Sequence, residues 1–194
     1  SVHPAPMAGV QLSAMAVAVS NAGGLGSLPC ALLTVEAMRK ELAAIRAATT
    51  SSYNVNFFCH TPPVPSDERE AAWRRLLAPY FDDYGIAADS IPAGAGRAPF
   101  TSEWAEALEE FRPRVVSFHF GLPPPQLLAR DKRWGSTILA SATTVDEARW
   151  LEKNGVDAVI AQGVEAGGHR GMFLSADVST QVGTFSLVPQ IVRA

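Results

Sequence analysis

The sequence predicts an α/β fold made of parallel βα units. Short apolar segments with β-branched residues alternate with longer segments of helical periodicity, and polar or glycine-rich turns separate them. About six such units fit into the 194 residues. An open, doubly wound sheet and a closed barrel both accommodate this pattern. The first turn reads PMAG and lacks the glycine-rich dinucleotide fingerprint, which disfavours the doubly wound sheet.

The first half of the chain contains several expected strands and helices. Residues 2–10 are expected to form the first strand, because Pro4 and Pro6 exclude a helix. Thr34 precedes a run with apolar residues at helical spacing, which predicts an N-capped amphipathic helix. The expected strands are 2–10, 24–28 and 53–58, and the expected helices are 12–20 and 34–47.

A long helical connection is expected at about 60–113. It holds a helix over 67–84, which Pro79 should end or kink, and a helix that begins after Thr101 as its N-cap. No boundary in it requires a second domain, so residues 1–194 are expected to form a single domain with this helical insertion. The later strands are expected at 115–120, 137–141 and 158–161, and the later helices from about 126, at 144–154 and at 184–193.

Composition and charge exclude several classes of partner. The net charge of −3, without a cluster of Lys and Arg on one face, argues against nucleic-acid binding. No uncharged apolar run reaches the roughly 18 residues that a membrane span needs, and the N-terminus lacks the basic region of a signal peptide. We therefore expect a cytoplasmic protein with no membrane partner. Cys30 and Cys59 lack metal-ligand spacing, so both should be reduced thiols and no metal site is expected.

The segment QGVEAGGHRG at 162–171 concentrates candidate functional side chains. It follows the apolar run 158–161, which has the composition of a strand buried in a parallel sheet. Gln162, Glu165 and His169 are interleaved with glycines, whose backbone can approach a ligand closely. An imidazole titrates near neutral pH, so His169 suits proton transfer. The simpler alternative is a flexible turn that happens to carry three polar residues.

Polar residues also lie on two expected strands. Asn54 and Asn56 alternate with apolar residues, so both should project from one face of the strand 53–58. A buried amide without a partner costs about 1–3 kcal/mol, so these amides need partners, and the backbone of neighbouring loops is one source. His119, in SFHFG, is either a structural histidine or part of a binding site.

Five motifs, APMAGV, NAGGLGS, NVN, SFHFG and QGVEAGGHRG, resemble in their order those of the nitronate monooxygenases, formerly called 2-nitropropane dioxygenases. The resemblance spans nearly the whole chain and implies an FMN-dependent (β/α)8 TIM barrel, of which about the first six βα units are present. It implies the oxidation of alkyl nitronates or nitroalkanes with O2 to carbonyl compounds and nitrite. The shorter string EAGGH also resembles a motif of the flavin-dependent enoyl-ACP reductases. An NAD(P)H-using oxidoreductase is therefore the alternative.

The resemblance also implies roles for individual residues. His169 would be the catalytic base, and His119 would contact the substrate at the mouth where the carboxyl ends of the strands converge. A longer cationic residue stands at the position of Ser141 in parts of the family, so the serine would remove a positive charge near the flavin. The implied FMN contacts are Ala5, Pro6, Met7, Asn56, Ser141, Gln162, Gly167 and Gly168.

A barrel of this kind usually takes about 250 residues and eight strands. The expected strands number six, and an open barrel would expose strand edges. We therefore expect a C-terminal barrel segment or a second chain to complete the protein. A truncated or split subunit without catalytic activity is a further alternative. The expected partners are a small nitroalkane or nitronate, O2 and this completing segment, and a homo-oligomer is left open.

Overall fold

The computed structural model describes residues 2–91 and 98–194, which divide into two compact units. The main unit comprises Ser1–His60 and Pro99–Ala194, and the small unit comprises Thr61–Ala98. Within the described residues, no helix is long and apolar enough to cross a membrane.

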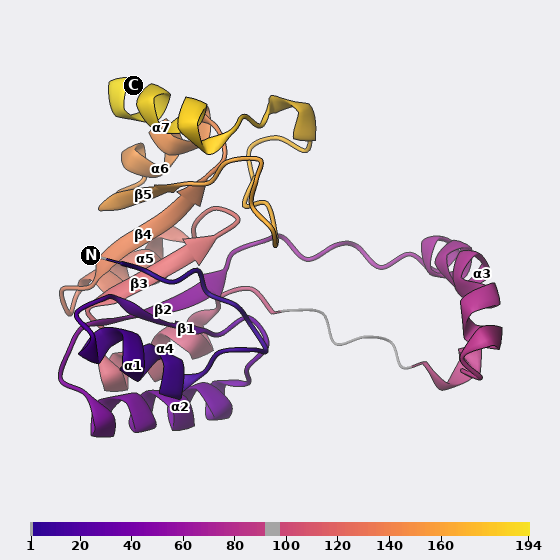
Figure 1. Cartoon of the computed structure of the whole chain (residues 1–194), viewed down its shortest axis with the longest axis horizontal. Helices are drawn as coiled ribbons and strands as arrows, with labels where there is room; N and C mark the ends of the chain where they lie inside the picture. The colour runs from indigo at the N-terminus through magenta and orange to yellow at the C-terminus, as the bar shows by residue number, and fades with distance from the viewer. Residues whose placement is uncertain (1, 92–97) are drawn as a thin grey trace. The chain divides into compact units, whose positions relative to one another are not determined.

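A parallel five-stranded sheet organises the main unit (Figure 1). Its strands lie in the order of the sequence, and each pairs in parallel with the next. The strands are β1 (Gly26–Pro29), β2 (Tyr53–Phe58), β3 (Val115–His119), β4 (Thr137–Ala142) and β5 (Ala158–Ala161). This arrangement confirms the predicted α/β class with parallel βα units.

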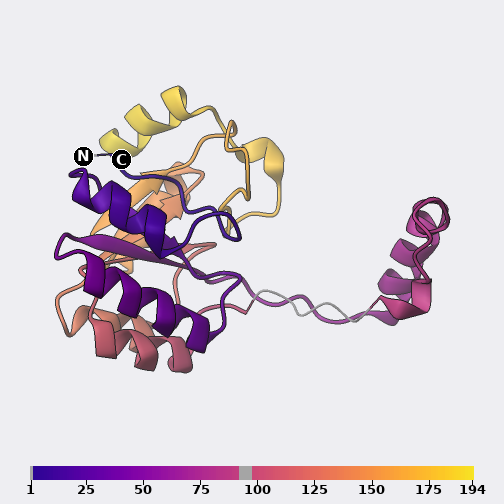
Figure 2. The same cartoon turned by 60° about the horizontal axis from the view of Figure 1, so that its bottom comes forward.

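Helices connect the successive strands of the main unit. Helix α1 packs against β1 and α2, and the rotated view shows α1, in indigo, beside α2, in purple (Figure 2). Helix α7 packs against α6 and β5 at the other end of the sheet (Figure 1). The helices are α1 (Ser13–Asn21), α2 (Val35–Ala48), α4 (Ser102–Phe111), α5 (Pro125–Lys132), α6 (Val145–Lys153) and α7 (Thr184–Arg193), with a short 3-10 turn at Val178–Thr180.

Side-chain caps begin two of these helices. Thr34 Oγ1 accepts a hydrogen bond from the Ala37 N–H at the start of α2, as the sequence predicts. Thr144 Oγ1 accepts one from the Glu147 N–H at the start of α6. Thr101 occupies the corresponding position before α4, but its side chain forms no cap bond. The predicted cap at Thr101 is therefore right in position and wrong in chemistry.

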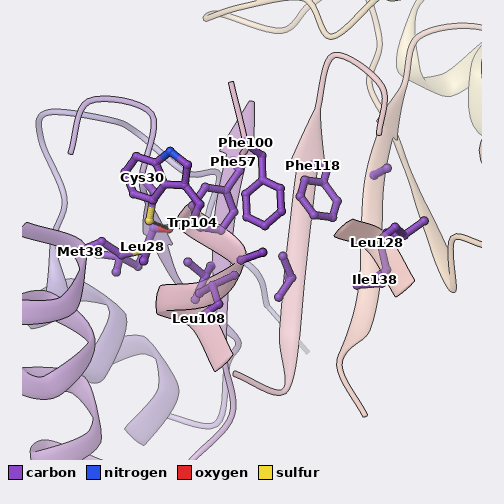
Figure 3. Packing of buried hydrophobic residues seen from close by; sticks show 14 of the residues in the cluster. Leu28, Cys30, Met38, Phe57, Phe100, Trp104, Leu108, Phe118, Leu128 and Ile138 are labelled. Atoms are coloured by element: carbon purple, nitrogen blue, oxygen red, sulfur yellow. Dashed lines mark hydrogen bonds between the residues drawn. The ribbon is translucent and has the colours of Figure 1, made fainter. Parts of the chain in front are cut away.

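The apolar core lies on the helix side of the sheet. Figure 3 shows the rings of Phe57, Phe100 and Phe118 gathered along β2 and β3, with Trp104 and Leu108 of α4 next to them. The centroid of the Phe57 ring lies 4.7 Å from that of Phe100 and 5.6 Å from that of Trp104. Large buried rings of this kind contribute much of a core's stabilisation. Helix α4 is thus a core element of the main unit.

The opposite face of the same strands carries buried polar side chains. Strand alternation places Asn54 and Asn56 of β2 on this face, with Ser27 of β1 and Ser117 of β3 next to them in register. Ser141 of β4 lies on the same face, because Leu139, two residues before it, pairs with Ser117. The sheet therefore has one apolar face and one face, called the polar face below, on which these polar side chains lie among apolar ones such as Leu139 and Ile160.

The predicted first strand, 2–10, is absent from the sheet, so the structure has five paired strands where the sequence predicts six. The Leu25 N–H donates to Val2 O at 2.8 Å, as at the start of a parallel ladder. The next donor in that ladder would be the N–H of residue 4, which Pro4 lacks. The side chain of His3 lies there instead, with Nδ1 3.1 Å from Leu25 O. The prolines that exclude a helix also prevent the ladder.

The small unit contains α3 (Asp67–Asp83) and a 3-10 turn at Ala88–Ser90. Pro79 does not end α3, because the helix continues through it. None of the residues of α3 is buried, so water can hydrate the carbonyl that Pro79 leaves without a partner. The unit covers Thr61–Ala98, which is shorter than the insertion expected at 60–113, because α4 packs into the main core.

Candidate functional site

The carboxyl ends of β3 and β5 carry the candidate site. His119 is the last residue of β3, and Gln162 follows β5 directly. In a parallel sheet these ends lie at the same edge, where ligands of α/β proteins bind. The segment 163–171 continues from Gln162 and brings His169 to His119. Two of the predicted residues, far apart in sequence, are therefore neighbours.

The side chain of Gln162 holds this loop closed. Its Nε2 donates to His169 O at 3.1 Å, and its Oε1 accepts from the Gly171 N–H at 2.6 Å. The Nε2 of His119 lies 3.4 Å from the same His169 carbonyl, a long contact. The amide of Gln162 thus has a positioning role within the chain, which the sequence does not reveal.

Glycines serve two different purposes in the loop. A Cβ on Gly171 would lie 2.5 Å from Cε1 of His119, so only glycine fits where the backbone passes the imidazole. Cβ atoms on Gly167 and Gly168 would meet nothing within 4 Å. Both residues are exposed. Their backbone groups are accessible to a ligand.

Phe58 and Phe120 pack against both histidines, and His60 packs against the two phenylalanines. The His169 ring lies edge-on to Phe58 at 5.4 Å and to Phe120 at 5.8 Å between centroids. His119 lies 4.4 Å from Phe120 and 5.7 Å from Phe58. His60 lies 6.2 Å from Phe58 and 6.1 Å from Phe120, and its buried Nδ1 has no hydrogen-bond partner among the described residues. Phe58, Phe120, His60 and His119, which we call the ring cluster, form a largely apolar wall beside the exposed His169.

The backbone at the end of β3 supports the ring cluster. Phe120 has a φ of 67° and Gly121 a φ of 89°, so the chain turns sharply after His119 through two residues in the left-handed region. This conformation is costly for a phenylalanine, and such strain concentrates at functional sites. SFHFG therefore owes its shape to Gly121 and to the packing of Phe120. Sequence reasoning identified His119 but missed the two phenylalanines and His60.

Burial disfavours the charged form of His119. Desolvation lowers the pKa of His119 below its ordinary value, and the charge of His169 acts in the same direction. The hydrogen bond to the His169 carbonyl opposes both effects. A neutral imidazole that uses Nε2 toward that carbonyl presents a weakly polar edge to the site.

The two predicted asparagines bond to serines of adjacent strands. Asn54 Nδ2 donates to Ser27 Oγ at 2.8 Å and to Ser117 Oγ at 2.9 Å, and Asn56 Nδ2 donates to the same Ser117 Oγ at 2.9 Å. The carbonyl oxygen of Asn56 takes part in neither of its bonds, and that of Asn54 is buried without a partner among the described residues. The amides therefore use their NH2 groups, whose partners are strand hydroxyls and, for Asn56, also the Ser117 carbonyl at 3.4 Å, not the backbone of loops.

The remaining predicted contacts lie apart from the histidines in the sequence and differ in exposure. Ser141 is buried on the polar face of β4, beside Ile160 of β5 in register. Ala5 and Met7 are exposed and Pro6 is partly buried, in the extended segment before α1. The Met7 carbonyl accepts from the N–H groups of residues 10 and 11, which turns this segment toward α1.

Glu165, which the sequence groups with Gln162 and His169, serves a helix end. Its two carboxylate oxygens accept from the Thr184 N–H at 3.0 Å each, and one also accepts from Thr184 Oγ1 at 3.0 Å. A hydrogen bond from its own backbone N–H lowers the pKa of Glu165 most, and the bonds from the N–H and hydroxyl of Thr184 lower it further. A Cβ on Gly163 would lie 2.2 Å from Oε2 of Glu165 and 2.2 Å from Oγ1 of Thr184. Only glycine at position 163 therefore leaves room for this carboxylate.

A second carboxylate, Glu147, was not found from the sequence. It is buried in α6 and accepts four hydrogen bonds, two from Thr143 and one each from Phe173 and Leu174. The available signal was its place three residues after Thr144, the spacing of a capping box. Among the residues that the structure describes, no group of three or more His, Cys, Asp or Glu side chains could hold a metal ion.

Sequence comparisons identify known proteins that this chain resembles. The family model described as nitronate monooxygenase matches residues 1–194. A nitronate monooxygenase of Paraburkholderia phytofirmans is 44% identical over 189 residues, covering 94% of this chain and 50% of that protein. One from Pseudomonas aeruginosa is 41% identical over 188 residues, covering 95% and 53%. The chain thus spans about half the length of the curated relatives it matches.

Solved structures give the same picture. The nitroalkane oxidase of Streptomyces ansochromogenes superposes with a TM-score of 0.86 at 37% identity, covering 98% of this chain and 55% of that one. FabK from Thermotoga maritima superposes with a TM-score of 0.67 at 25% identity, covering 98% and 46%. The predicted fold class is confirmed, because the five parallel βα units match about half of a TIM-barrel relative.

Proposed function

This chain belongs to the nitronate monooxygenase family, and from that premise we propose that the protein oxidises alkyl nitronates or nitroalkanes with O2 to carbonyl compounds and nitrite, using FMN. The family is flavin-dependent in general. The observation that carries the proposal is the approach of His169 to His119 at the carboxyl ends of the strands, beside two phenylalanines. An imidazole against an apolar wall suits a small nitro compound with an alkyl chain.

His169 is the proposed base. Its imidazole is exposed at the edge of the ring cluster and belongs to a loop that Gln162 holds. It would take a proton from the carbon next to the nitro group, and general-base catalysis of this kind contributes about 10²–10⁴-fold in rate. A substrate that is already a nitronate has no such proton to lose.

His119 is the proposed substrate contact. Burial lowers the pKa of His119, which disfavours a positive charge beside the substrate, and the ring would contact the substrate mainly through its weakly polar face. Phe58 and Phe120 would cover the alkyl part of the substrate and exclude water from it.

The open backbone at Gly167 and Gly168 supports a flavin site beside the 163–171 loop, because a Cβ at either position would meet nothing within 4 Å and their N–H and C=O groups are accessible to a polar ring. When bound, FMN would accept electrons from the substrate, and O2 would complete the oxidation. The residues proposed to hold it are Ala5, Pro6, Met7, Asn56, Ser141, Gln162, Gly167 and Gly168.

Replacing His169 by alanine in the intact protein tests the base role. We expect the turnover of a neutral nitroalkane to fall by about 10²-fold or more, while turnover of the matching nitronate falls far less. Steady-state kinetics with both substrates and the visible flavin spectrum of each variant provide the measurement. Unchanged turnover of the neutral nitroalkane would remove His169 from this role.

An NAD(P)H-using flavin oxidoreductase is the second candidate, favoured by the similarity to FabK at 25% identity. Anaerobic mixing of the flavin-loaded protein with NADH or NADPH separates the two. Rapid bleaching of the flavin absorbance supports the reductase, and its persistence until a nitronate is added supports the monooxygenase.

A further inference from the structure

Glu147 joins two segments that are distant in the sequence. Glu147 lies on α6 and is only 1% exposed. One oxygen, Oε2, accepts from the Thr143 N–H at 2.7 Å and from Thr143 Oγ1 at 2.8 Å. The other, Oε1, accepts from the Phe173 N–H at 2.6 Å and the Leu174 N–H at 3.1 Å. The carboxylate therefore ties the turn after β4 to the chain just beyond the 163–171 loop.

A helix cap alone does not account for this geometry. In a capping box, the glutamate at the third helical position bonds to the N–H of the capping residue itself, here Thr144. Thr144 does accept from the Glu147 N–H at 3.2 Å, so the first half of the box forms. The Glu147 carboxylate instead reaches one residue further back, where Oε2 accepts from Thr143. Its other oxygen, Oε1, accepts from the backbone N–H groups of Phe173 and Leu174.

The bonds of Gln162 and Glu147 hold adjacent stretches of the chain, at the end of the 163–171 loop and just beyond it. Gln162 fixes the loop where it closes, at His169 and Gly171. Glu147 fixes Phe173 and Leu174, which lie two and three residues after Gly171, against the start of α6. Phe173 also packs on Trp150 of α6, with ring centroids 5.2 Å apart. With its exit anchored in this way, the loop can hold His169 in one position.

We propose that Glu147 is a positioning residue for His169. The inference rests on the proposed function for its catalytic part only. Misplacing a reacting group by about 1 Å can cost on the order of 10²-fold in rate, so a loop that carries a base needs firm anchors close to that base. A buried carboxylate facing four donors is such an anchor, because each donor left without an acceptor is costly.

The test compares Glu147→Gln with Glu152→Gln in the intact protein. Glutamine has the shape of glutamate, but its NH2 group must face either the Thr143 donors or the Phe173 and Leu174 donors. Glu152 lies on the same helix and is exposed, so its replacement is the matched control. Trypsin cleavage after Arg170 reports on the loop without any substrate. Arg170 is exposed, but Gly171 is buried with its N–H bonded to Gln162, so cleavage requires the loop to open.

We expect Glu147→Gln to speed cleavage after Arg170 by about tenfold or more, with cleavage after Arg39 and Arg46 in α2 unchanged. We also expect the ratio of neutral-nitroalkane turnover to nitronate turnover to fall by about tenfold while the flavin spectrum is retained. Glu152→Gln should change neither readout. Unchanged cleavage after Arg170, or equal acceleration at every site, would overturn the proposal.

A second variant covers the case in which Glu147→Gln does not fold. Thr143→Val keeps the shape of the side chain and removes one donor to Glu147, so a smaller acceleration after Arg170 is expected, and no acceleration overturns the proposal. The cleavage readout is independent of the chemistry. If His169→Ala leaves neutral-nitroalkane turnover unchanged, the proposed base role fails, while faster cleavage in Glu147→Gln still supports the anchor.

Discussion

Single atoms decide the shape of the candidate site. A Cβ on Gly171 would collide with the imidazole of His119, and a Cβ on Gly163 would collide with the carboxylate of Glu165. Neither glycine is needed for loop flexibility. Both are needed because backbone approaches a side chain more closely than any substituted residue allows. Gly167 and Gly168, by contrast, have open space around them and are the glycines of this loop that a ligand can reach.

Asp131 of α5 is a buried carboxyl group outside the site. It has no exposed surface, and neither of its oxygens has a hydrogen-bond partner among the described residues. Burial raises the pKa of Asp131 to about 7, although the charge of Arg130 opposes the shift. Burial of Cys59 itself raises the pKa of its thiol, and the charge of Asp131 raises it further.

Replacing Asp131 by asparagine should stabilise the protein at alkaline pH. The folded-state pKa lies above the unfolded value, so the ionised form is disfavoured in the fold and stability falls as pH rises from about 4 to about 7. We expect the variant to exceed the parent by a few kcal/mol at pH 8 and to match it near pH 4. Urea unfolding at both pH values measures this. Parallel stability curves for the two proteins would contradict it.

At the scale of the elements, the helix ends show what sequence patterns convey. Thr34 and Thr101 both precede helices and both are exposed, yet only Thr34 bonds to the helix, through Oγ1 and the Ala37 N–H at 3.1 Å. A side-chain cap satisfies one of the N–H groups that the first turn leaves open.

We predict that Thr34→Ala lowers the free energy of unfolding by about 1 kcal/mol and that Thr101→Ala lowers it much less. The two substitutions remove the same atoms from the same helical position, so each controls for the other. Urea denaturation with a common slope for both variants gives the values. Equal losses would mean that the exposed hydroxyl itself, and not the cap bond, matters.

At the scale of the whole molecule, the segment 61–98 behaves as an insertion. The Phe100 N–H donates to Phe58 O at 2.8 Å, so the chain returns to the end of β2 close to where it left. The helix within the segment, α3, has no buried residue. We propose that residues 1–194 form one domain with this segment inserted.

Replacing residues 61–98 by a linker of about six glycines and serines should leave the main unit folded, because a short loop closes two neighbouring ends at small entropic cost. We expect a cooperative thermal transition with a midpoint within a few degrees of the parent's, measured by far-UV circular dichroism. A control linker of about twice that length should behave alike. Loss of the cooperative transition in both would show that the segment supports the core.

Local patterns were enough to predict most elements of the main unit. The strands β2 and β5 and the helix α7 lie where alternation and periodicity place them, at Tyr53–Phe58, Ala158–Ala161 and Thr184–Arg193. These signals are local, since they depend on which face of an element is buried. The prediction of the first strand was wrong because Pro4 lacks the N–H that would donate to Leu25 O. That requirement becomes visible only when the two segments lie side by side.

The sequence by itself determined the class of the fold and the order of its parallel units. It also singled out two histidines and Gln162 as candidate site residues. Only the tertiary structure decided what these residues touch: that Gln162 and Glu147 bond to the chain around His169, that Glu165 bonds to the start of α7, and that Phe58 and Phe120 pack against both imidazoles. The physical reason is distance along the chain. Periodicity and capping act over a few residues, whereas these contacts join residues that become neighbours only when the sheet forms.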